Sequence, residues 1–186
     1  MKTIKLLFLV IMISACSFTT YAGGKYGLRF GYQASNIYNN GSSFNSNTLN
    51  AFYVGMFAEQ RIVPMLFFGS GSEYSQVGTM ENNDMKSMIH YVSIPTYLKL
   101  KVGPVYAIGG AAASFKVYEK HYYKDITKDP YANAAWFDIP VYAGVGIQIL
   151  VFRIEARYNW GTFDLYNAPN DGYKSQYLQF GVAIAL

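Results

Sequence analysis

Apolar and polar residues alternate along most of this chain, and this period of two limits its fold more than any other feature. In the stretch KYGLRFGYQAS, residues 25–35, the even positions are apolar and the odd positions are small or polar. Successive side chains of a β-strand point to opposite faces, so the stretch predicts a strand with one apolar and one polar face. Seven further stretches alternate in the same way, at about residues 49–60, 65–76, 91–102, 105–118, 137–149, 152–161 and 178–186.

The connections between these stretches alternate in length. Long polar segments and short turns follow one another, the long ones at residues 36–47, 77–87, 119–135 and 162–175, the short ones at 61–64, 103–104 and 150–151. A tilted strand of about 9 to 11 residues crosses a bilayer, and long loops on one side with short turns on the other are typical of outer-membrane barrels. The sequence therefore predicts an all-β fold, an eight-stranded antiparallel up-and-down transmembrane β-barrel with both termini at the short-turn side. In the stretch 105–118, glycine and alanine lie on both faces, and its inward side stays unassigned.

Nine charged residues of the predicted strands fall on the face opposite the apolar one. They are Arg29, Glu59, Glu73, Lys99, Lys101, Asp138, Arg153, Glu155 and Arg157. An arginine or lysine facing lipid at the bilayer midplane costs about 2 to 4 kcal/mol, so we expect all nine to point into the barrel. Side chains nearly fill the interior of an eight-stranded barrel, and buried charges need partners. The nine residues therefore predict a lumen charge network whose first role is structural.

Two other interpretations stay open. An open lumen would make the chain a pore or carrier for small solutes. A soluble barrel of the lipocalin type also has alternating strands, but it lines its interior with apolar side chains and exposes polar ones. The charges of this chain follow the reverse arrangement, so a soluble binding barrel is the least favoured of the three.

Residues 1–22 have the layout of a secretory signal peptide. Lys2 and Lys5 precede an apolar block, and small or polar residues end the segment. We expect cleavage after Ala22, which leaves residues 23–186 as the outer-membrane barrel domain.

The only cysteine, Cys16, lies within this leader. The exported domain therefore has no disulfide and no thiolate metal site. ISAC at residues 13–16 resembles a bacterial lipobox, and cleavage there would make Cys16 a lipidated first residue. Loss of Lys2 and Lys5 lowers the net charge of +4 by two, which does not indicate a nucleic-acid partner.

The last predicted strand ends in QFGVAIAL. Gln179, Gly181, Ile184 and Leu186 fit the polar, glycine and hydrophobic positions of the terminal strand that the outer-membrane insertion machinery reads. A leucine stands at the last position, where an aromatic residue is usual. We predict these four residues as an insertion signal, with outer-membrane lipid and the barrel insertion machinery as partners.

The segment YEKHYYKDITKDPYANAAW, residues 118–136, has the composition of a binding surface. The predicted surface consists of Tyr118, Lys120, Tyr122, Tyr123 and Lys124. Tyrosine and lysine are residue types that stack on sugars or contact anionic partners. The alternative is that the tyrosines belong to an aromatic girdle and a self-packed loop.

Catalytic chemistry has little support in the sequence. His90 and His121 are the two histidines, each near a predicted loop. A phosphate-binding glycine loop, a zinc ligand pattern and a nucleophile elbow are all missing from the sequence. We therefore expect no enzyme activity, no cofactor and no metal site.

Three stretches of the chain resemble a known family. YVSIPTYLKLKVGPVYAIGGAA, FDIPVYAGVGIQ and RIEARYNWGTFDLYN are similar to the small outer-membrane β-barrel proteins of the Bacteroidetes, grouped as PorT-like or OmpA-like barrel domains. Glu59 and Glu73 stand where that pattern commonly has inward acids, whereas Ser93 replaces a frequent glutamate and Pro140 a frequent glycine. The resemblance implies an integral barrel of the bacterial outer membrane, with extracellular loops and periplasmic termini. The PorT member serves protein secretion and gliding-related export.

These observations together predict a structural or interaction role in the cell envelope. The expected partners are outer-membrane lipid, the insertion machinery and a secretion-complex or surface protein.

Overall fold

The computed structural model describes residues 24–39, 42–43, 47–81, 85–123, 135–162 and 173–186. The predicted signal peptide and Cys16 lie outside these residues. The strands are β1 (Lys25–Asn39), β2 (Ser42–Ser43), β3 (Asn47–Val63), β4 (Leu66–Glu81), β5 (Met85–Val102), β6 (Val105–Tyr123), β7 (Phe137–Asp138), β8 (Val141–Ile149), β9 (Phe152–Trp160) and β10 (Tyr173–Ala185).

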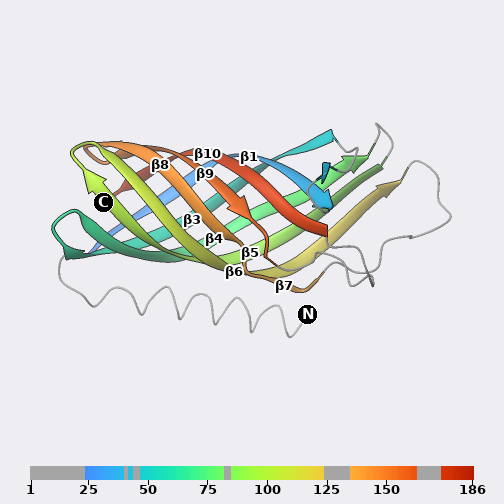
Figure 1. Ribbon diagram of the computed structural model, residues 1–186, viewed down its shortest axis with the longest axis horizontal. Helices are drawn as coiled ribbons and strands as arrows, with labels where there is room; N and C mark the ends of the chain where they lie inside the picture. Colours follow the sequence, from blue (N-terminus) through green and yellow to red (C-terminus); the bar gives the residue numbers. More distant parts are fainter. Residues whose placement is uncertain (1–23, 40–41, 44–46, 82–84, 124–134, 163–172) are drawn as a thin grey trace.

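The eight long strands close into a barrel (Figure 1). Each pairs antiparallel with its neighbour in the order β10-β9-β8-β6-β5-β4-β3-β1, while β2 and β7 are two-residue additions to β1 and β6. Closure comes from β1 and β10, which pair continuously from Gly27 with Ala185 to Asn39 with Tyr173. The predicted eight-stranded antiparallel up-and-down barrel is confirmed.

The strands on the loop side are longer than the sequence predicted. Residues 77–87 were expected to form a long polar loop, but β4 and β5 pair from Val77 with Ile89 to Glu81 with Met85. Likewise, β6 continues to Tyr123, beyond the predicted end at residue 118. Both loop predictions rested on polar composition and were wrong at these positions. An antiparallel ladder satisfies the hydrogen bonds of its backbone groups whatever the side chains are.

The predicted strand at residues 137–149 is interrupted. Ile139 and Pro140 lie between β7 and β8, outside either strand. Proline has no backbone N–H to donate to the ladder, so it breaks the pairing at this point. Its carbonyl still accepts a bond of 2.9 Å from the Ala112 amide, which keeps the backbone attached to β6.

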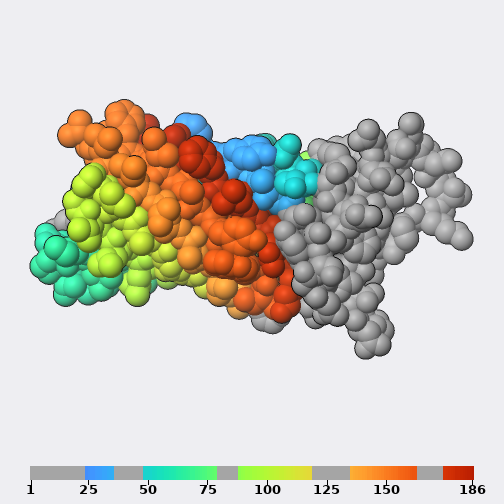
Figure 2. Space-filling view, turned by 45° about the horizontal axis from the view of Figure 1, so that its top comes forward, coloured from blue at the N-terminus to red at the C-terminus, as the bar shows by residue number. Residues whose placement is uncertain are grey.

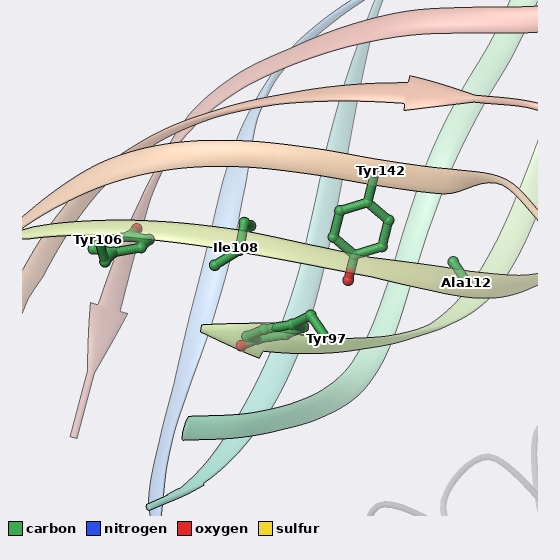
Figure 3. Close-up of a cluster of buried hydrophobic side chains, with 5 residues drawn as sticks. All are labelled: Tyr97, Tyr106, Ile108, Ala112 and Tyr142. Atoms are coloured by element: carbon green, nitrogen blue, oxygen red, sulfur yellow. The ribbon is translucent and has the colours of Figure 1, made fainter. Parts of the chain in front are cut away.

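The inward face of β6, which the sequence left unassigned, carries Tyr106, Ile108, Ala112 and Ser114, all buried. The intervening positions 107 and 109 are exposed. Figure 3 shows Tyr106, Ile108 and Ala112 together with Tyr97 and Tyr142 as one cluster of buried side chains.

Glycines make room for these tyrosines. A Cβ at Gly69 would lie 2.3 Å from Cζ of Tyr97, and one at Gly146 would lie 2.4 Å from Cζ of Tyr106. The core is therefore filled by large rings packed against bare backbone.

The outer face of the barrel is apolar on every side. Each of the eight long strands exposes large apolar side chains, among them Leu28, Val54, Phe68, Leu98, Val117, Val145, Ile154 and Phe180. Among the side chains that the structure describes, exposed charges are limited to Lys25, Arg61 and Lys174, each near a strand end. No helix within the described part of the chain is long and apolar enough to cross a membrane.

Candidate functional site: the ion-paired interior

Glu59 of β3 is the centre of the first group of interior charges. Both of its oxygens accept bonds from Arg153 of β9, at 2.7 and 2.8 Å, and Lys99 of β5 forms an ion pair with the same carboxylate. The hydroxyl of Tyr97 donates a further bond of 2.9 Å. Because β1 and β10 separate β3 from β9 in the sheet, the bonds between Glu59 and Arg153 cross the lumen.

Glu73 of β4 is the centre of a second group. It accepts bonds from Arg157 Nη2 at 2.8 Å and from Gln179 Nε2 at 2.7 Å. Gln179 also donates to Gln33 at 2.9 Å and accepts from Asn159 at 3.2 Å. This carboxylate therefore joins β4 to β9 and β10 across the interior.

Glu155 connects the two groups. Its Oε1 lies 3.1 Å from Arg157 Nε and 3.7 Å from Arg29 Nη1, and its Oε2 accepts a bond of 2.9 Å from the Tyr106 hydroxyl. Arg29 in turn donates to the Tyr97 hydroxyl at 3.1 Å, and that hydroxyl reaches Glu59. Three acids and four bases thus form one connected network.

Aromatic rings fill the space between the charges. Phe57 contacts two guanidinium groups, with Arg29 and Arg153 each 4.7 Å from the ring centroid. Arg157 lies 5.0 Å from the ring centroid of Tyr53. Contacts of this kind stabilise a desolvated cation, so the rings both fill the lumen and hold its positive charges.

A small polar cavity lies on the loop side of this network. Its walls are Ser75, Val77, Tyr91, Ser114, Asp138, Pro140, Ser175 and Tyr177. The volume is about 10 Å³, which is close to the space that one water molecule needs.

The nine residues predicted as a lumen charge network divide into three sets. Seven of them join the network just described: Arg29, Glu59, Glu73, Lys99, Arg153, Glu155 and Arg157. Asp138 lines the polar cavity instead, and Lys101 is half-exposed at the short-turn end.

Sequence reasoning did not include Tyr97, Tyr106 or Gln179 among the network partners. Strand alternation places Tyr97 and Gln179 on the inward face and could have identified them as candidates, whereas it leaves open which way Tyr106 points. Gln179 was predicted only as part of the insertion signal. The role of Gln179, Gly181, Ile184 and Leu186 in insertion stays a prediction.

The predicted loop surface lies only partly within the described residues. Tyr118 is exposed on β6, and its ring lies 5.7 Å from that of His90. Lys120, Tyr122 and Tyr123 belong to the backbone of β6, and Lys124 falls outside the described residues.

The two histidines were the sequence candidates for a base or a metal ligand. His90 Nδ1 lies 2.6 Å from the Tyr74 hydroxyl within a row of outer aromatic rings. The side chain of His121 is not described. No group of three or more metal-ligating side chains occurs in the described part of the chain.

A pair of tyrosines tests the network. Tyr97→Phe removes a hydroxyl that bonds both Arg29 and Glu59, whereas the Tyr142 hydroxyl has no hydrogen-bond partner among the described residues. We expect Tyr97→Phe to lower the free energy of unfolding by about 1 to 3 kcal/mol and Tyr142→Phe to leave it nearly unchanged. Urea titration of the folded barrel, followed by tryptophan fluorescence, measures both. Equal effects of the two changes would contradict the assigned bonds.

Comparison with solved structures identifies the fold. The chain is similar to Neisserial surface protein A, with a TM-score of 0.57 and 13% identity over 88% of this chain and 99% of that one. It has the fold of a small outer-membrane β-barrel. It is also similar to the attachment invasion locus protein Ail of Yersinia pestis, crystallised with the heparin analogue sucrose octasulfate, with a TM-score of 0.51 and 14% identity over 89% and 100% of the two chains. No protein-family model and no curated protein sequence matches the chain, so the PorT-like resemblance rests on the quoted residues alone.

Proposed function

We propose that the chain is an integral protein of the bacterial outer membrane, closed by its own ion-paired core, which acts through the surfaces at its two ends and does not pass solutes. The observation that carries this proposal is the set of three interior carboxylates, each of which forms an ion pair with at least one base from another strand. The signal peptide predicted from the sequence agrees with a location in the outer membrane.

The distribution of polarity supports membrane embedding. Large apolar side chains are exposed on all eight long strands, while the network charges are turned inward. Monomeric soluble proteins seldom expose contiguous apolar surface of such extent. A soluble binding barrel would need the opposite arrangement.

The interior contacts support closure. Arg153 bonds Glu59, and Arg157 bonds Glu73, in both cases across the barrel between strands that are not neighbours. Opening a path for solutes would separate these buried charges from their partners, which is costly. We therefore favour a pinned core over a pore or carrier.

The role at the ends is an interaction with partner proteins, as in the secretion or envelope complexes that the PorT-like resemblance implies. A sulfated polyanion of the kind bound to Ail is not favoured for this chain. Its loop-side segments, residues 77–90, 116–136 and 162–175, contain six bases and seven acids.

We also propose that the chain is not an enzyme.

Insertion into liposomes tests the membrane assignment. The chain without residues 1–22 is refolded with phospholipid vesicles, which are then floated on a density gradient and washed with carbonate. We expect the protein to float, to resist the wash and to run faster on an unheated gel than on a heated one. A folded protein that stays soluble without detergent would overturn the proposal in favour of a soluble barrel.

A further inference from the structure

The short-turn end of the barrel carries three bases around the mouth of the lumen. Lys25 and Arg61 are exposed and Lys101 is half-exposed. Each base lies an even number of positions from an inward residue of the same strand, so strand alternation places it on the inward side. The pairs are Lys25 with Arg29, Arg61 with Glu59, and Lys101 with Lys99. We call Lys25, Arg61 and Lys101 the basic mouth.

The basic mouth carries an excess of positive charge. None of the three bases forms an ion pair with an acidic side chain among the described residues. Glu59 lies two positions before Arg61 on β3 and points into the barrel. It is only 3% exposed and already binds Lys99 and Arg153. No acidic side chain is exposed in the part of the chain whose side chains are described. The mouth therefore attracts an anionic group from outside the chain.

Two of the three turns at this end have an apolar tip in an unfavourable backbone conformation. Met65 has φ 75° and Leu150 φ 56°, in the left-handed region that residues with a Cβ seldom adopt. The third turn has Gly103 at φ 59°, which is the residue expected there. Met65 is 55% exposed and Leu150 85% exposed, so neither side chain gains much burial within the barrel. Figure 2 shows that end at its left, with the three turns in teal, lime and orange.

Strain and exposure at both tips have no benefit for the isolated barrel. Residues held in such conformations cluster where a protein binds something. Two exposed apolar tips and three bases without an ion-pair partner thus share the short-turn end of the barrel. The combination matches a ligand that offers both carboxylates and apolar side chains.

We propose that the short-turn end is a docking face for an acidic amphipathic segment of a partner protein, with Met65 and Leu150 contacting its apolar side chains and the basic mouth its carboxylates. The three bases stand at the end of the lumen and not on the apolar outer face, so a ligand approaches them from the aqueous side. The proposal rests on the proposed function and on the orientation that the family resemblance implies, in which this end faces the periplasm.

A synthetic peptide of alternating glutamate and leucine tests the docking face. Its binding to the folded barrel in nanodiscs is followed by fluorescence anisotropy, and a lysine–leucine peptide of the same pattern is the control. We expect only the acidic peptide to bind, with an affinity that falls as salt is raised.

Two sets of variants separate the parts of the face. Lys25→Gln, Arg61→Gln and Lys101→Gln combined should lower the affinity by about tenfold and flatten the salt dependence, whereas Lys174→Gln at the other end should change neither. Met65→Gly with Leu150→Gly should also weaken binding, yet leave the unfolding temperature equal or higher, because glycine relieves the left-handed strain. A barrel that loses stability and binding together in the glycine variant would overturn the contact role of the tips.

The remaining outcomes are also decisive. Equal binding of the acidic and basic peptides, or unchanged affinity in the basic-mouth variant, overturns the proposal. Nanodiscs with and without phosphatidylglycerol cover the lipid alternative: no peptide binding, but retention of phosphatidylglycerol that the basic-mouth variant abolishes, would assign the bases to lipid. A sample that does not insert into liposomes fails the proposed function, whereas one that inserts but binds no peptide fails the docking face alone.

Discussion

Glu59→Leu is expected to destabilise the barrel by about 3 to 5 kcal/mol, because it leaves Arg153 and Lys99 buried without their carboxylate. Arg153 and Lys99 are 3% and 1% exposed, so water cannot replace the lost partner. Urea unfolding of the barrel in phospholipid vesicles, read as the loss of the fast-migrating band on an unheated gel, measures the change.

The matched control removes the whole ion group. Combining Glu59→Leu with Arg153→Met and Lys99→Met replaces every member with an apolar side chain of similar size, and such replacements are often neutral or stabilising. The triple variant should therefore be more stable than the single one. A single variant as stable as the unchanged chain would mean that Glu59 does not pair these bases.

Met56→Arg on the outer face should cost about 2 to 4 kcal/mol, since it places a charge against lipid at mid-strand. Met56 is 47% exposed and lies midway between Phe52 and the short-turn end of β3. Ile62→Arg, on the same face of the same strand but at its end, is the control and should cost about 1 kcal/mol or less. The same vesicle-based urea titration compares the two.

A soluble barrel predicts the opposite result. An arginine at an exposed position of a water-soluble protein changes stability by about 0.5 kcal/mol or less. Equal and small effects of Met56→Arg and Ile62→Arg would therefore argue against an outer face in lipid.

Much of the barrel could be predicted from the sequence because a strand has a period of two. Once Leu28 and Phe30 face outward, Arg29 must face inward, and the same logic places Glu59, Glu73 and Arg157. The number of strands follows from counting such stretches. These conclusions need no knowledge of how the strands pair.

The pairing of individual charges could not be predicted, because it depends on how far each strand is displaced relative to those across the lumen. Glu59 meets Arg153, 94 positions later in the chain, only after β1 and β10 close the barrel. The contribution of Tyr97 follows from the same three-dimensional arrangement. Asp138 shares the inward face with the network charges, yet it lies nearer the loop side of the barrel, at the polar cavity.

Strand ends were the least predictable part of the fold. The backbone ladder of β4 and β5 continues through polar residues up to Glu81 and Met85, where composition indicated a loop. The left-handed conformations of Met65 and Leu150 also give no signal in the sequence, since neither residue type favours them.

Electrical conductance of the folded barrel in a planar bilayer tests the central claim, that the ion-paired interior closes the lumen. The sample is first shown to be folded by its heat-dependent migration on a gel. We predict a folded barrel that carries no steady ionic current at either polarity. A steady current through the unchanged chain would contradict the account and make the interior charges the lining of a pathway.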